Sequence, residues 1–140
     1  MDSSVVIVGS GLAGYAVARE LRKLNTAIPI TLLSADHGGF YSKPMLSNVL
    51  STGKDPASLL TGNTEKMRSQ LKIDIRPNHC VTTINVARNV IQSTNGEDVS
   101  YDQLILAIGA DQIRLPMQGD AVGKIYTVND LDDYQTFYTA

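Results

Sequence analysis

The fold is decided by a ten-residue stretch near the N-terminus, VVIVGSGLAG, which occupies residues 5–14. It joins a β-branched run, Ser3–Val8, to a segment with helical spacing, Leu12–Leu24. The run predicts a buried parallel strand. Apolar and small side chains on one face of the second segment, with charged ones opposite, predict an amphipathic helix. A further apolar run, Ile30–Leu33, completes a strand–helix–strand unit.

The turn of this unit matches the pattern G-x-G-x-x-G. In such a turn the first glycine, Gly9, permits a tight exit from the strand, and Gly11 lets a pyrophosphate approach the backbone. Gly14 allows close packing of helix on strand, while free N–H groups and the helix dipole favour phosphate. The context therefore predicts dinucleotide binding, with a merely tight strand–helix turn as the alternative.

A carboxylate that holds the adenosine ribose is expected at the end of the second strand. Ser34 is the first residue past that strand and Asp36 lies two residues further. Asp36 is the better acceptor for ribose hydroxyls, and the alternative is that it only caps the loop. No arginine follows the strand immediately, so there is no sign of a 2′-phosphate site.

The middle of the chain changes character from alternating strands and helices to short strands. Helices are expected over Pro44–Val49 and over Thr64–Leu71, and a strand is expected around Ile73 and Ile75. An antiparallel meander is then expected, with strands at Cys80–Ile84, Val90–Thr94 and Val99–Tyr101 and a type I′ turn at Asn95-Gly96.

The last part of the chain returns to longer elements. An apolar strand is expected at Leu104–Ile108, a further strand at Ile125–Val128, and a helix that starts at Asn129 or Asp130. The predicted fold class is therefore α/β, a Rossmann-like domain with a parallel sheet and an inserted three-stranded antiparallel meander.

Composition narrows the functional classes. The chain has 140 residues, a formal net charge of −2, 43 % apolar residues and an isoelectric point near 5.5, which suits one domain. This charge argues against a nucleic-acid partner, and the apolar runs are too short for membrane insertion. One cysteine, Cys80, is expected to be a small buried hydrophobe, and it fits a cytoplasmic protein. The two histidines are expected to be solvated, and no metal site is expected.

Beyond the glycine turn, several motifs resemble those of a known family. They are YSKPMLS at 41–47, YDQLILAIGA at 101–110, IRLP at 113–116 and NDLDDY at 129–134. Together and in this order they resemble the FAD-dependent pyridine nucleotide-disulfide oxidoreductases, and among these the rubredoxin reductases. Ile108 stands where the wider superfamily most often has threonine, a departure that favours this subgroup.

The resemblance implies an FAD domain with an inserted NADH domain, and electron flow from NADH through FAD to rubredoxin or a similar iron-containing acceptor. It implies that Lys43 is a cationic contact to FAD and that Val81 is a backbone contact to adenine. The cofactor-binding residues predicted from the pattern and the resemblance together are Gly9, Ser10, Gly11, Leu12, Ala13, Gly14, Asp36, Lys43 and Val81.

Two features limit the expected chemistry. Disulfide-reducing relatives carry a redox cysteine in the segment that corresponds to Lys43–Asn48, which here contains none. Electrons are therefore expected to pass directly from the flavin to an external acceptor, and no catalytic side chain is assigned. The chain, residues 1–140, is expected to be the N-terminal FAD-binding part of a longer enzyme, without the NADH domain and the C-terminal part, and inactive alone.

Other functions stay open at this point. A ferredoxin reductase of an oxygenase system would look very similar over this length. A catalytically silent nucleotide-binding module would share the glycine turn. An NAD-dependent dehydrogenase domain without flavin is disfavoured, because the expected meander interrupts the strand–helix alternation that such a domain would continue.

Overall fold

The computed structural model describes residues 3–140, which form two compact units. The first unit contains the chain up to Tyr41 together with Thr61–Gly109. The second contains Ser42–Leu60 and Ala110–Ala140. The glycine turn, Asp36 and Val81 all belong to the first unit, whereas Lys43 belongs to the second.

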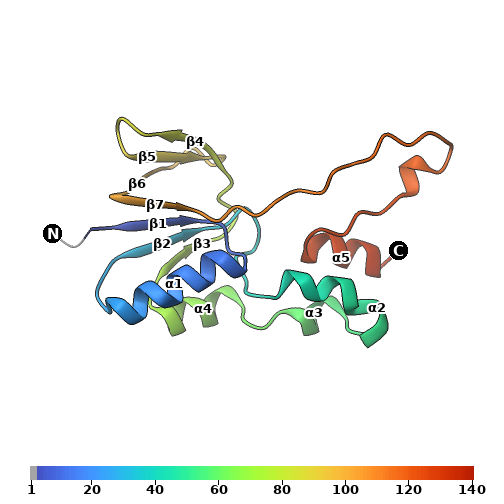
Figure 1. The fold of residues 1–140 in the computed structure, drawn as a ribbon, viewed down its shortest axis with the longest axis horizontal. Coiled ribbons are helices and arrows are strands. Elements are labelled where there is room, and N and C mark those ends of the chain that lie inside the picture. Colours follow the sequence, from blue (N-terminus) through green and yellow to red (C-terminus); the bar gives the residue numbers. More distant parts are fainter. Residues whose placement is uncertain (1–2) are drawn as a thin grey trace. The chain divides into compact units, whose positions relative to one another are not determined.

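A four-stranded parallel sheet forms the centre of the first unit (Figure 1). Its strands are β1 (Val5–Val8), β2 (Ile30–Leu33), β3 (Asp74–Arg76) and β7 (Gln103–Leu106), in the order β3-β2-β1-β7. Two helices, α1 (Leu12–Leu24) and α4 (Thr64–Leu71), cover one face of this sheet. The predicted strand–helix–strand unit is thereby confirmed, and β1 pairs in parallel with both β2 and β7.

The opposite face of the sheet packs against an antiparallel meander. It consists of β4 (Val81–Asn85), β5 (Val90–Ser93) and β6 (Asp98–Ser100), in sequence order. Side chains of β1 alternate between the two faces: Val5 and Ile7 join α1 and α4 in one core, while Val6 and Val8 join Ile91 of the meander in the other. Burial on both faces is why β1 has an uninterrupted apolar sequence. The predicted α/β class with an inserted meander is confirmed.

Two local predictions in the meander are wrong. The turn between β5 and β6 is not type I′, because only Gly96 has a positive φ (79°), and the Gly96 N–H bonds the Ser93 carbonyl at 2.9 Å. The loop of four residues is long enough to use an ordinary turn followed by a left-handed glycine. Cys80 is exposed and not buried: it directly precedes β4, an edge strand of the meander whose own residues are half-buried or exposed.

The second unit is built from short helices. They are the 3₁₀ helices η1 (Lys43–Asn48) and η2 (Val122–Lys124) and the α-helices α2 (Val49–Thr52), α3 (Pro56–Leu59) and α5 (Leu131–Tyr138). Asp130 caps α5 by accepting from the Asp133 N–H at 2.8 Å, as the predicted helix start requires. Inside this unit the hydroxyl of buried Tyr134 donates to the Lys54 carbonyl at 2.6 Å.

The strand expected at Ile125–Val128 is wrong. Residues 125–128 are irregular, and Ile125 and Val128 are exposed to 48 % and 40 %. A strand needs a neighbouring backbone for its N–H and C=O groups, and the structure pairs this segment with none of the described strands.

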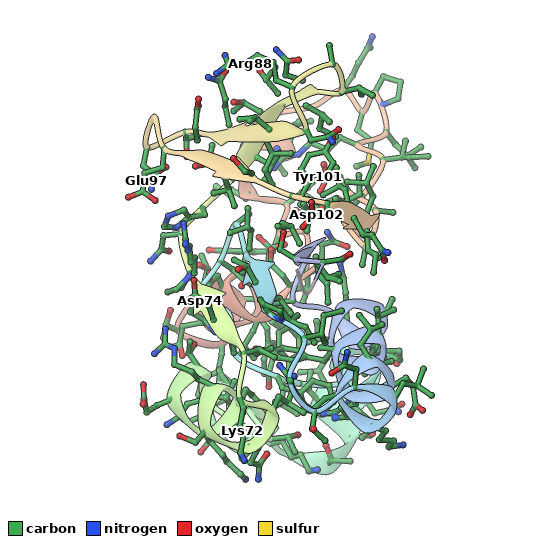
Figure 2. The ribbon with its side chains drawn as sticks, turned by 90° about the vertical axis from the view of Figure 1, so that its left-hand side faces the viewer. Lys72, Asp74, Arg88, Glu97, Tyr101 and Asp102 are labelled. Atoms are coloured by element: carbon green, nitrogen blue, oxygen red, sulfur yellow. The ribbon has the colours of Figure 1, made fainter. Side chains whose placement is uncertain are left out.

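Asp102 joins the starts of β1 and β7 in the first unit. Its Oδ2 accepts from the Ser4 N–H at 2.7 Å and from the Ser4 hydroxyl at 2.8 Å. The Ser4 carbonyl in turn accepts from the N–H groups of Asp102 and Gln103. Figure 2 shows Tyr101 and Asp102 between the meander and the parallel sheet. The Ser4 backbone N–H, and then its hydroxyl, lower the pKa of Asp102 below the ordinary value of 3.8.

The hydrogen bonds between Ser4 and Asp102, called the Ser4–Asp102 clamp below, predict a pH-dependent contribution to stability. A carboxyl whose pKa is lower in the folded state stabilises the fold above its unfolded pKa, and that stabilisation is lost as the pH falls through the folded-state pKa. Asp102→Asn should therefore lower the urea midpoint at neutral pH, with a difference from the wild type that narrows below pH 3.8. Exposed Asp120 provides the control as Asp120→Asn. An unchanged midpoint at neutral pH would contradict the Ser4–Asp102 clamp.

Candidate functional site

The glycine turn lies at the point where the strand order of the sheet reverses. From β1 the chain continues to β2 and β3 on one side, whereas β7 pairs on the other side. The Gly9 N–H donates to the Leu33 carbonyl at 2.8 Å, and the Ala107 N–H donates to the Val8 carbonyl at 2.8 Å. Ligands of open α/β sheets bind at the carboxyl ends of the strands near such a reversal. The glycine turn therefore lies at the edge of the sheet where proteins with this topology bind their ligands.

Gly9 and Gly14 are required by close approach of backbones. Gly9 has φ 113°, and a Cβ built on it would lie 2.1 Å from the Ala107 carbonyl oxygen. A Cβ on Gly14 would lie 1.9 Å from the carbonyl oxygen of Gly9. Both values are far below any permitted contact, so β7, β1 and α1 can meet as they do only without side chains here.

Gly11 differs from Gly9 and Gly14, because the space next to its Cα is open. It is the N-cap of α1 with φ −72°, and a Cβ there would meet no atom of the described residues within 4 Å. The cap provides no side-chain hydrogen bond to the first turn of the helix. The N–H groups of Leu12 and Ala13 lie in that turn, where no helical partner exists for them. This open, donor-rich cradle fits a pyrophosphate.

Asp36 is held beside this turn by three donors. Its Oδ1 accepts from the Gly38 N–H at 2.8 Å, from the Ser34 hydroxyl, and from the Ser10 hydroxyl at 3.2 Å. The two hydroxyls also bond each other at 2.6 Å. Ser10 belongs to the glycine turn and Asp36 to the loop after β2, so the structure brings together the two sets of residues that the sequence predicted for pyrophosphate and ribose.

The loop that carries Asp36 is fixed from several sides. Its main chain accepts hydrogen bonds from the Tyr15 hydroxyl of α1, at Gly38, and from the Thr64 hydroxyl at the start of α4, at His37. Tyr15 is fully buried. Burial, and secondarily the charge of Asp36, raises the pKa of Tyr15 to about 12, so its hydroxyl stays a donor throughout the physiological range.

The segment after β3 lies alongside the same loop. The Asn78 N–H donates to the Asp36 carbonyl at 2.9 Å, and the His79 N–H donates to the Ser34 carbonyl at 2.7 Å. Val81 follows at once as the first residue of β4 and is half-buried against the meander core. This connection brings the main chain that leads into Val81 to the Asp36 loop; its contact with adenine stays a prediction.

The remaining predicted residues divide into two groups. Ser10 is half-buried, and Leu12 and Ala13 are exposed on the first turn of α1. Lys43 is exposed at the start of η1 in the second unit, and its role as a cationic contact stays a prediction. The expectation of a solvated His79 is wrong: its side chain is only 16 % exposed and bonds Pro77, Asn95 and Glu97.

The sequence did not identify Ser34 and Tyr15 as parts of the site. The sequence pattern favours Asp36 over Ser34 as the ribose acceptor and indicates no role for Tyr15. The available signal for Ser34 was its position directly after a buried strand, at the same edge as the glycine turn. Hydroxyl-to-hydroxyl bonds of this kind join residues 24 apart in the chain, so their geometry depends on the sheet register.

Two further findings bear on the class of site. Within residues 3–140, no group of three or more His, Cys, Asp or Glu side chains is placed to hold a metal ion. No helix in the described part of the chain is long and apolar enough to cross a bilayer.

Comparison with known proteins identifies the family. The model of the family described as pyridine nucleotide-disulphide oxidoreductase matches residues 3–140. The rubredoxin-NAD(+) reductases of Alcanivorax borkumensis and Acinetobacter baylyi are 43 % and 42 % identical to the chain, over 97 % and 95 % of its length and 35 % of theirs. The solved ferredoxin reductase for the CYP199A2 system of Rhodopseudomonas palustris superposes with a TM-score of 0.85 and 26 % identity, over 98 % of this chain and 34 % of that one.

The chain therefore spans about a third of the length of the curated relatives it matches. The family model, by contrast, covers almost the whole chain, including the glycine turn and the meander. On this evidence the chain belongs to the pyridine nucleotide-disulphide oxidoreductase family.

Proposed function

We propose that the chain is the N-terminal FAD-binding part of an NADH-dependent flavoprotein reductase that passes electrons from NADH through FAD to rubredoxin. The observation that carries the proposal is the open cradle at Gly11, within a turn that the fold otherwise packs tightly. Membership of the family supports FAD as the cofactor, and the two rubredoxin-NAD(+) reductases support the electron donor and acceptor.

In this proposal the described residues bind and orient the cofactor. The N–H groups at the start of α1 bind the pyrophosphate, and the Asp36 carboxylate accepts from the adenosine ribose. Main-chain atoms of Val81 contact adenine, and Lys43 adds a positive charge to the cofactor's surroundings. When bound, FAD supplies the hydride and single-electron chemistry, which no side chain has to provide.

The cysteine content supports an external electron acceptor. The only cysteine, Cys80, lies before β4, and the segment Lys43–Asn48 contains none. A dithiol relay between flavin and substrate needs two thiols, so it is not supported by this chain. An iron-containing protein of the rubredoxin class suits direct transfer. A cytoplasmic location agrees with one unpaired cysteine.

A second candidate acceptor is a ferredoxin. The observation that favours it is the superposition on the Rhodopseudomonas ferredoxin reductase, with a TM-score of 0.85. The fold over this length is compatible with either acceptor, and the higher identity to the rubredoxin-NAD(+) reductases, 43 % against 26 %, favours rubredoxin.

Cofactor binding by the purified chain is the direct test. We expect FAD and ADP to compete for one site, because the described contacts involve only the adenosine and pyrophosphate moieties, and we expect no NADH-driven reduction of rubredoxin by residues 1–140 alone. Equilibrium titration with FAD, displacement by ADP and a rubredoxin reduction assay provide the measurements. Absence of binding, or turnover by this chain alone, would contradict the proposal.

A substitution at Gly11 tests the cradle itself. Gly11→Val should leave the chain folded, at a cost of about 1 kcal/mol because valine is a poor N-cap. It should weaken ADP binding about tenfold or more, because the side chain takes the space of the pyrophosphate. Gly123→Val is the matched control, since Gly123 also has open space in the described structure and an ordinary φ. Equal ADP affinity in folded Gly11→Val would refute the assignment.

A further inference from the structure

Ser34 is the one residue among the Ser10–Ser34–Asp36 group whose side chain is almost completely buried. It is 2 % exposed and lies at the C-terminal end of β2, with its N–H bonded to the Arg76 carbonyl at 3.0 Å. A buried hydroxyl without partners is costly, and here both partners lie in the nucleotide site: Ser10 in the glycine turn and Asp36 in the ribose loop.

The number of protons on each group decides which hydroxyl donates in the Ser10–Ser34 and Ser34–Asp36 hydrogen bonds. A serine hydroxyl has one proton to donate and lone pairs to accept. The Ser34 hydroxyl donates to Oδ1 of Asp36, so in its 2.6 Å contact with Ser10 it accepts. The Ser10 proton therefore points inward, and the phosphate-binding role of Ser10 is left to its backbone.

The two carboxylate oxygens of Asp36 differ in the number of hydrogen bonds that they accept. Oδ1 accepts from the Ser34 hydroxyl and from the Gly38 N–H at 2.8 Å, and the Ser10 proton, directed at Ser34, reaches Oδ1 only as the weaker arm of a shared bond at 3.2 Å. Among residues 3–140 the structure describes no donor to Oδ2. Since Oδ1 already has two full donors and the weaker Ser10 contact, Oδ2 is the oxygen with capacity for a ligand.

We propose that Ser34 is a positioning residue that orients the Asp36 carboxylate, so that Oδ2 accepts a hydrogen bond from a ribose hydroxyl of an adenosine nucleotide. This inference rests on the proposed nucleotide-binding function and assigns a specificity role to a residue two positions before the acceptor. Without the Ser34 donor the carboxylate keeps the Gly38 N–H and the longer 3.2 Å contact with Ser10, but loses its shortest hydrogen bond, which fixes its rotation. Discrimination between ribose and deoxyribose then falls.

The test compares ADP with 2′-deoxy-ADP and 3′-deoxy-ADP by calorimetric titration of the full chain. A hydrogen bond to a charged acceptor predicts that the wild type prefers ADP about tenfold or more over the analogue that lacks the bonded hydroxyl. Asp36→Asn should bring this ratio close to one, and Ser34→Ala should lower it at least about threefold. A change in fold alone would weaken ADP and the analogues equally and leave the ratio intact.

Two further variants make the experiment specific. Ser34→Cys keeps the shape of the side chain, with a slightly larger atom, and replaces a strong donor by a weak one. It should also lower the ratio, and it serves if the alanine variant does not fold. Ser93→Ala is the matched control, because Ser93 is also buried, at 5 % exposure, and bonds Asn95. Its ratio should equal that of the wild type.

The outcomes separate this inference from the function on which it rests. If the wild type binds neither ADP nor FAD, the proposed function fails and the role of Ser34 with it. If the wild type binds and discriminates but both Ser34 variants keep the full ratio, the role of Ser34 alone is refuted. A reduced ratio in the Ser34 variants, with an intact ratio in Ser93→Ala, supports it.

Discussion

The structure depends on two places where backbone lies directly against backbone. Gly9 meets the main chain of Ala107, and Gly14 meets the main chain of Gly9, so that β7, β1 and α1 converge around one turn. Neither approach leaves room for a Cβ. The close packing brings the N-terminus of α1 to the edge of the sheet, and it leaves Gly11 as the open position of the motif. The open space at Gly11 thus lies between two tightly packed positions, Gly9 and Gly14.

Around that turn, the first unit is organised by the two faces of β1. Alternate side chains of Val5–Val8 enter the helical core and the meander core, so that β1 belongs to both. The meander thereby holds the sheet from the face opposite α1. It also brings β4 next to the loop of Asp36, through the bonds that Asn78 and His79 make to that loop. A segment that interrupts the strand–helix alternation is in this way connected directly to the loop of Asp36.

How far the sequence could predict this structure depended on how local the determining interaction was. The glycine turn, α1 and the meander follow from periodicity and turn residues, and they were predicted. The prediction of a strand at 125–128 was wrong, because the β-propensity of these residues does not provide a neighbouring strand to pair with. The burial predicted for Cys80 was wrong because β4 is an edge strand that is largely open to solvent, which a local pattern does not show. The hydrogen bonds of Ser34 with Ser10 and Asp36 depend on the register of β2 against β1. That register brings two hydroxyls and one carboxylate within bonding distance.

The bond network between Ser4 and Asp102 has a consequence for the order of folding. It joins residues 98 positions apart, and β7 pairs with β1 across a similar separation. During synthesis, one edge of β1 stays unpaired until the meander has been made and β7 has followed it. Pairings this distant in sequence form slowly, because the closure entropy of a long loop must be overcome first. The nascent chain therefore carries an open, apolar strand edge until β7 has been synthesised, and during that period aggregation competes with folding.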